Sequence, residues 1–294
     1  MKDDKSKSEV NIIFAIALRS QGSTDNWKNV TENFNNTLKS IFNQTNPNFL
    51  VYVGCNEIPE LYEPYDERLQ FFQVANPVPK EWLEMARDKF WKYSVVAQKI
   101  RDYLLETSNP GNGVFVLPMD ADDYVHNQIC EYVGSHNEAN GFVSEYGYVF
   151  YHKNNRLIKY NQMHTLCGSC NIIKMYLDDL PSELPAPELC FDKETAGVLN
   201  SRYPIRWDYH ILVEKYKDLG KSFSILPFPS TIYYLGNGDN ISAIYSLEHA
   251  SKATIMKRIR SVASKIKHYL ERRKSLVKIT PEIRESFAFY QGKK

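Results

Sequence analysis

The apolar residues of the first 120 positions fall into short continuous runs that alternate with helical patterns. The runs cover 11–18, 49–54, 69–75 and 114–118. Apolar runs without polar alternation are typical of strands that are buried on both faces of a parallel sheet. Between them, apolar residues recur at helical spacing over 24–44 and 82–106. This order predicts β-α-β-β-α-β, and therefore an α/β fold with a mostly parallel central sheet and flanking helices.

The pattern is less regular after residue 126. We expect strands in 141–152 and 223–235, a proline-rich loop at 180–189, and a helix over 209–219 that ends at Gly220. This half should complete the same domain and shape a second binding site. The predicted organisation is a disordered lead (1–10), one domain (11–250) and a C-terminal extension (251–294).

Composition and charge limit the classes of function. The 294 residues are 43% hydrophobic, which is enough for a full core and excludes a disordered chain. The 36 Lys and Arg residues nearly cancel the 35 Asp and Glu residues. No overall field therefore draws the chain to nucleic acid, and a charged ligand has to be recognised by a local site.

The cysteines and the N-terminal segment indicate the cellular compartment in which the protein is expected. Five scattered cysteines do not make a disulfide scaffold, so we expect a reducing compartment. His164, Cys167 and Cys170 match HxxCxxC, but no second pair exists to complete a structural zinc site, and we reject that interpretation. The first apolar run is far too short to span a membrane. These features predict a cytoplasmic protein.

Three carboxylates follow the fourth apolar run within four positions. Asp120, Asp122 and Asp123 directly succeed "VFVLPM". In an extended segment residues i and i+2 point the same way, so Asp120 and Asp122 can offer oxygen ligands to one Mg²⁺ or Mn²⁺ ion, which commonly bridges carboxylates to phosphates. The alternative is a solvated acidic turn in which Asp122 or Asp123 caps the next helix.

Over residues 11–245 the chain resembles the GT-A glycosyltransferases, especially bacterial family-2-like members. The motifs that carry the resemblance are "LRS" (18–20), "RDKFWKY" (87–93), "FVLPMDADD" (115–123), "CGSCNIIK" (167–174) and "WDYHILVEKYKDLGK" (207–221). The resemblance implies a GT-A fold, a Rossmann-like α/β arrangement. It also implies a nucleotide-sugar donor whose diphosphate is held by a metal at the DxD motif.

The resemblance assigns expected roles to residues of this sequence. Asp120 is expected near the ribose and Asp122 on the metal, while Asp123 either faces the metal or caps a helix. Arg19, with Ser20 beside it, and Lys89 lie where such enzymes approach the nucleotide. The family often has an Asp after its second strand to contact the base. Here "GCNE" stands at that place, so Asn56 or Glu57 must substitute.

The resemblance also implies a catalytic base. Inverting members use the Asp of an "ED" pair that opens a helix some ninety residues beyond DxD. Asp208 lies at comparable spacing, although Trp207 replaces the acid before it. A carboxylate there would take the proton of the acceptor hydroxyl as it attacks the anomeric carbon. Asp208 as a helix N-cap is the alternative, and His210 is a second candidate for base or acceptor contact.

Residues 252–278 carry ten Lys and Arg against one Glu, with apolar residues at three- and four-residue steps. This predicts an amphipathic helix with a cationic face. Such a helix either lies on an anionic membrane surface or docks on the domain with its basic side in water. Peripheral attachment to the inner face of a membrane would suit an enzyme that extends a lipid-linked glycan.

The sequence therefore predicts a metal-dependent glycosyltransferase that moves a hexose from a nucleotide sugar, with UDP expected as the carrier, to a glycan or lipid-linked acceptor in surface polysaccharide synthesis, with inversion. Two alternatives stay open. One is a non-catalytic nucleotide- or carbohydrate-binding protein of the same fold. The other is a phosphoryl-transfer enzyme that uses the first Asp as nucleophile, although that class carries its DxD near the first strand.

Overall fold

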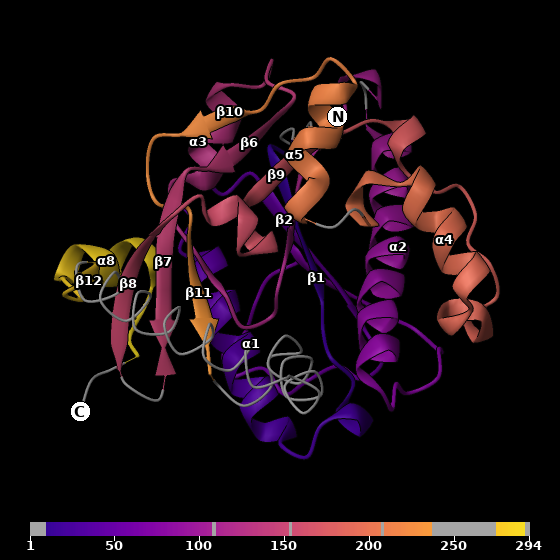
Figure 1. Ribbon diagram of the computed structural model, residues 1–294, viewed down its shortest axis with the longest axis horizontal. Helices are drawn as coiled ribbons and strands as arrows, with labels where there is room; N and C mark the ends of the chain where they lie inside the picture. The colour runs from indigo at the N-terminus through magenta and orange to yellow at the C-terminus, as the bar shows by residue number, and fades with distance from the viewer. Residues whose placement is uncertain (1–9, 108–109, 153–154, 207–208, 237–274, 292–294) are drawn as a thin grey trace, which may run out of the picture.

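The structure, a computed structural model, describes residues 10–107, 110–152, 155–206, 209–236 and 275–291, which form two sheets with helices around them (Figure 1). The main sheet has the spatial order β10 (Ser224–Leu226), β6 (Gly141–Ser144), β9 (Asn171–Met175), β4 (Val114–Met119), β1 (Ile12–Ala17), β2 (Phe49–Cys55) and β3 (Leu69–Gln73). The second sheet has the order β12 (Leu276–Val277), β8 (Arg156–Asn161), β7 (Tyr146–Tyr151), β11 (Thr231–Leu235) and β5 (Tyr124–Val125). The α-helices are α1 (Trp27–Phe42), α2 (Trp82–Glu106), α3 (Ile129–Ser135), α4 (Lys193–Arg202), α5 (Tyr209–Asp218) and α8 (Pro281–Phe287).

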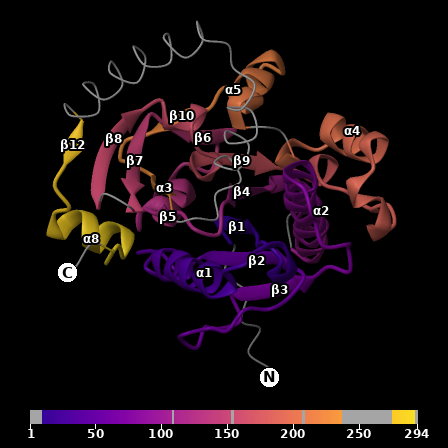
Figure 2. The same cartoon turned by 60° about the horizontal axis from the view of Figure 1, so that its bottom comes forward.

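The predicted elements of the first 120 residues are confirmed, and with them the mixed α/β class. β1 to β4 run parallel to one another, and β9 is the antiparallel strand between β4 and β6. Alternate residues of β1 serve two cores: Phe14 packs on the side of α1, and Ala15 on the side of α2. Figure 2 shows α1 and α2 at different sides of these strands. Burial on both faces explains the uninterrupted apolar runs.

Each of the two later strand regions is divided between the sheets. The region 141–152 forms β6 in the main sheet and β7 in the second, and 223–235 forms β10 and β11 in the same way. The hydroxyl of Ser144 connects the two places where the chain passes from the main sheet to the second sheet. It donates to the carbonyl of Tyr146 and accepts from the amide of Ser230 at 3.2 Å. A buried side chain thus satisfies backbone groups that the change of sheet leaves unpaired.

The C-terminal segment 275–291 packs on the second sheet. β12 pairs with β8, and Ile283, Phe287 and Phe289 complete a core behind β5. The predicted basic helix is therefore wrong at its end, since Leu276 and Val277 are in a strand, and the predicted extension is in part integral to the domain. Residues 252–274 lie outside the described residues. None of the helices that the structure describes is both long and apolar enough to cross a membrane.

His126, just after β5, gives this core a dependence on pH. Its ring stacks on Phe228 with centroids 4.6 Å apart, and burial lowers its pKa to about 4. The ordinary value is about 6.5, so between these values the unfolded chain binds more protons than the folded one. Stability from neutral His126 is therefore complete above about pH 6.5 and is lost as the pH falls toward 4.

We expect acidification from pH 7 to pH 5 to lower the free energy of unfolding of the wild type by about 2 kcal/mol through His126. At pH 5 the unfolded chain holds this proton and the folded chain does not, so folding has to release it. Urea unfolding of the wild type and of His126→Gln at both pH values measures the difference. The half-buried His136 provides the matched control, His136→Gln. An equal loss in wild type and His126→Gln would contradict this assignment.

Candidate functional site

The chain reverses its direction across the main sheet between β1 and β4. It runs outward from β1 to β2 and β3, and returns through α2 to β4 on the other side of β1. Ligands of open α/β sheets bind outside the carboxyl ends of the strands at such a point. Arg19 and Ser20 follow β1, Asn56 and Glu57 follow β2, and the acidic turn that begins at Asp120 follows β4.

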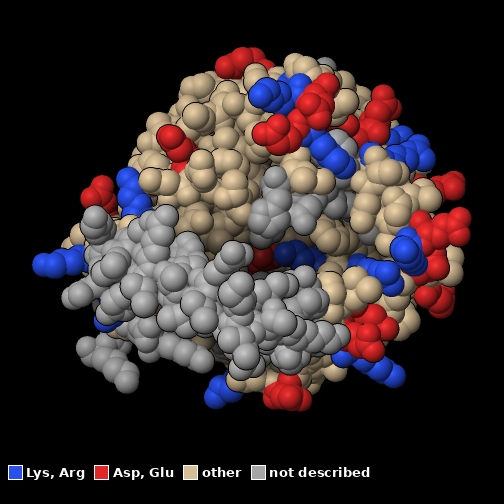
Figure 3. Space-filling view, viewed as in Figure 1, with Lys and Arg blue, Asp and Glu red and all other residues tan. Residues whose placement is uncertain are grey.

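Lys89 and Asp120 form an ion pair at this edge. Lys89 comes from α2 and contacts the Asp120 carboxylate, and the two side chains are 31% and 32% exposed. Burial by itself lowers the pKa of the Lys89 ammonium, but the neighbouring Asp120 charge outweighs it and holds that pKa above its ordinary value. Figure 3 shows an acidic and a basic group side by side at the bottom of a hollow in this face. The predicted nucleotide-side lysine thus lies on the acidic turn itself.

Asp123 differs from its two neighbours because it is fully enclosed. Its Oδ2 accepts hydrogen bonds from Ser169 at 2.6 Å and from the Cys167 thiol at 3.1 Å, and its Oδ1 accepts from the Tyr234 amide at 3.0 Å. Burial, and then the charges of Asp122 and Asp120, raise the pKa of Asp123 well above its ordinary value. A metal at Asp123 would have to displace these donors, so its predicted metal contact stays a prediction.

Ser169 connects the buried carboxylate to the exposed one. Its hydroxyl donates to Asp123 and accepts from the backbone amide of Asp120 at 3.0 Å. The residue sits in the short helix Gly168–Cys170, where a small side chain fits against the turn. No helix starts directly after Asp123, because β5 follows, so the alternative of a carboxylate that caps a helix is wrong for this residue.

The thiols of the CGSC motif bind protein groups. Cys167 donates to Asp123, and the Cys170 thiol donates to the Cys167 carbonyl at 2.9 Å. All five cysteines are buried and free. Among the residues that the structure describes, no three His, Cys, Asp or Glu side chains form a ready-made metal cluster. A cation at the acidic turn would need oxygens from a ligand besides those of Asp120 and Asp122.

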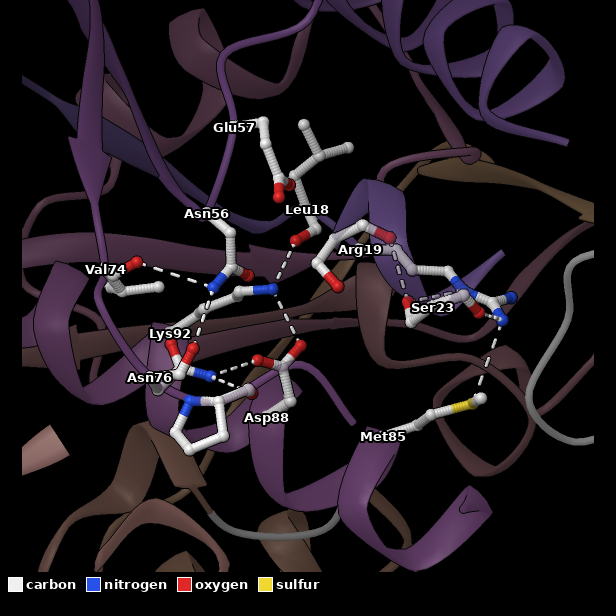
Figure 4. Close-up of polar contacts among 12 residues, drawn as sticks. Leu18, Arg19, Ser23, Asn56, Glu57, Val74, Asn76, Met85, Asp88 and Lys92 are labelled. Carbon is white, nitrogen blue, oxygen red and sulfur yellow. Dashed lines mark hydrogen bonds and ion pairs between the residues drawn. The ribbon is translucent and has the colours of Figure 1, made fainter. Parts of the chain in front are cut away.

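The end of β1 is tied to its own loop, as Figure 4 shows for Arg19 and Ser23, and to the end of β2. The Arg19 guanidinium donates to the Ser23 hydroxyl at 3.1 Å and approaches the Met85 sulfur at 3.8 Å. The Glu57 carboxylate accepts from the Gln21 amide at 3.0 Å. Arg19 and Glu57, two of the predicted nucleotide contacts, therefore lie at this edge of the sheet, where they hold the loop that follows β1.

Asn56 donates its amide hydrogens to the carbonyls of Val74 at 3.4 Å and Asn76 at 3.3 Å. Its Oδ1 is buried and has no hydrogen-bond partner, and the same is true of Asn76 Oδ1 and Ser20 Oγ. Three of the eleven buried side-chain atoms without a partner in the described part of the chain thus lie near this edge of the sheet.

The two predicted catalytic residues are not placed. Asp208 lies outside the described residues, and the side chain of His210 is also outside them, although its backbone belongs to α5. Their roles stay predictions from the sequence.

Sequence reasoning missed four residues of this region. Asn76, Asp88, Lys92 and Ser169 all contribute buried polar contacts. Asp88 and Lys92 are four residues apart in a helix, a spacing that ordinarily marks a solvated ion pair. The signals in the sequence were the motifs "RDKFWKY" and "CGSCNIIK", which contain three of these residues, and Gly54 within an apolar strand, which indicates a close approach of another segment.

Comparison with models of protein families and with curated protein sequences gave no match for the chain.

Proposed function

We propose that this protein is a GT-A glycosyltransferase that transfers a hexose from a nucleotide sugar to a glycan or lipid-linked acceptor, with inversion. The observation that carries the proposal is the position of the acidic turn. Asp120 and Asp122 follow β4 at the point where the strand order reverses, and Lys89 lies against Asp120. This is the place where open α/β sheets bind ligands, and its charges suit a phosphorylated ligand with a cation.

The donor set fits Mn²⁺ or Mg²⁺. Carboxylate oxygens are the ligands that these ions prefer, and the Asp120 side chain is partly exposed rather than enclosed. A bound cation supplies positive charge that stabilises the departing diphosphate. Lys89 exchanges its contact with Asp120 for a phosphate oxygen. Asp123, held by Ser169 and Tyr234, keeps the turn in place.

Asp208 acts as the base in this proposal. It removes the proton of the acceptor hydroxyl while that oxygen forms a bond to the anomeric carbon and the bond to the diphosphate oxygen breaks. His210 is the second candidate for this role. The resemblance to the family supports Asp208 over other acids.

The nucleoside is proposed to lie over the ends of β1 and β2. Arg19, Asn56 and Glu57 border this region, and the buried oxygens of Asn56, Asn76 and Ser20 lie near the same strand ends. The base itself is not assigned, because Asn replaces the expected Asp.

A screen of nucleotide sugars with Mn²⁺ tests the proposed function. We expect one of them to be hydrolysed slowly and its nucleoside diphosphate, at a hundredfold excess over Kd, to raise the Tm by about 4–5 °C. The metal-free reactions are the control. Tight, Mn²⁺-dependent binding of UDP without turnover of any sugar would favour a non-catalytic binding protein, and no binding at all would reject both functions.

A further inference from the structure

We propose that the buried ion pair of Asp88 and Lys92 is a positioning device for the nucleotide side of the site. The inference rests on the proposed function, since it assigns that site its internal support. Lys92, on α2, is 0% exposed, and its Nζ donates to Asp88 Oδ2 at 2.7 Å and to the Leu18 carbonyl at 2.8 Å. Lys92 thereby holds the backbone one residue before Arg19.

A fully enclosed ion pair is poorly explained by stability alone. Desolvation of two charges offsets their attraction, and well-packed apolar residues at such places are often as stable or more stable. The same helix carries an ordinary ion pair, Lys99 with Asp102, at 2.9 Å and largely in solvent. The enclosed pair differs from the exposed one in its further hydrogen bonds, which reach Leu18 and Asn76.

Asp88 and the Pro77 carbonyl together orient the Asn76 amide, because both accept from its Nδ2. The Asp88 Oδ1 accepts from Asn76 Nδ2 at 2.7 Å, and because a carboxylate accepts hydrogen bonds, the NH₂ of Asn76 must face it. The Asn76 amide oxygen consequently points away from Asp88 and has no partner.

Asn56 bonds to the backbone of the segment that contains Asn76. The backbone carbonyl of Asn76 and that of Val74 both accept from Asn56 Nδ2. Carbonyls only accept, so the NH₂ of Asn56 must face them and its Oδ1 is left unpartnered. The ion pair thus holds the Leu18 carbonyl and one acceptor side of the Asn76 amide, while Asn56 bonds to the backbone of the same segment as Asn76 (Figure 4).

Gly54 makes this arrangement possible. A methyl group on Gly54 would lie 3.0 Å from both the Cβ and the carbonyl oxygen of Lys92, which is too close for an ordinary contact. The glycine lets α2 approach β2 closely enough for the Lys92 ammonium to reach Leu18 at the end of β1. Two chain segments near the proposed nucleoside, those of Leu18 and Asn76, are therefore held by one helix.

Replacing the pair by apolar residues tests the inference. We expect Asp88→Leu/Lys92→Met to fold, yet to bind the tightest of UDP, dTDP, GDP, CDP and ADP with Mn²⁺ at least tenfold more weakly, because the Leu18 carbonyl and the Asn76 amide lose the partners that hold the ends of two strands in place. Binding of Mn²⁺ with inorganic pyrophosphate should stay within twofold, since it depends on the acidic turn. In transfer assays the donor KM should rise while kcat stays within threefold. Titration calorimetry measures the affinities, and Lys99→Met/Asp102→Leu is the matched control on the same helix.

Each outcome decides the proposal. Unchanged nucleotide affinity in the folded variant, or an equal loss for nucleotide and pyrophosphate, overturns the positioning role and leaves the proposed function intact. A wild type that binds neither ligand overturns the proposed function and this inference with it. Should the double variant not fold, Asp88→Asn keeps the shape of the side chain, and the same loss of at least tenfold, confined to the nucleotide, is expected from it. Wild-type affinity of this variant would again overturn the role.

Discussion

Asp122→Asn is expected to reduce the Mn²⁺-dependent affinity for a nucleoside diphosphate at least about a hundredfold, close to 3 kcal/mol of binding free energy. The substitution removes one of the two charges proposed to hold the cation, and the cation is the main link between protein and diphosphate. The fold should be unaffected, because Asp122 lies partly exposed at the end of β4. Titration calorimetry with and without Mn²⁺, together with thermal unfolding, measures both quantities.

The control for this experiment is Asp178→Asn, which removes an exposed carboxylate from another part of the chain. It should leave nucleotide affinity unchanged. If Asp122→Asn binds the Mn²⁺-nucleotide complex like the wild type, the metal site lies elsewhere and the acidic turn is only a solvated turn. Loss of metal-independent binding as well would indicate damage to the fold rather than to a cation site.

Asp208→Asn is expected to lower kcat by about 10²- to 10⁴-fold, the usual contribution of a general base, while donor affinity stays within about twofold. The amide keeps the size of the side chain but cannot take the proton of the acceptor hydroxyl. Transfer rates at saturating donor and acceptor, measured with direct donor binding, separate chemistry from affinity.

Two variants make the result for Asp208 specific. Asp218→Asn changes an exposed carboxylate at the other end of α5 and should be neutral. His210→Gln tests the second candidate base. Near-normal turnover of Asp208→Asn, with a large loss in His210→Gln, would transfer the role to the histidine.

The local pattern was a good guide where each element has a uniform environment. β1 is apolar at every position because both of its faces are buried, and α2 has an apolar stripe because a sheet covers it. The acidic turn was also expected at a strand end, and it lies there. Region 223–235 was harder, because apolar content does not show that a strand changes sheet at Ser230.

The candidate site was likewise predictable from the sequence only in part. The exposed part of the acidic turn could be anticipated, since Asp120 follows β4 directly. The different environment of Asp123 could not, because it depends on Ser169 and Tyr234, which are 46 and 111 positions away. The pairing of Lys89 with Asp120, 31 positions apart, likewise arises only when α2 packs on the sheet.

The order of apolar and polar residues determined which segments are strands and helices and placed three carboxylates at the end of one strand, because these properties depend on near neighbours in the chain. The packing of distant segments decided which carboxylate faces solvent, which is enclosed, and which lysine is buried. Burial and hydrogen bonding depend on what lies opposite in space, and that is set only when the sheets and α2 come together. Asp88 and Lys92 look like a surface pair in the sequence and form the enclosed support of the site in the folded protein.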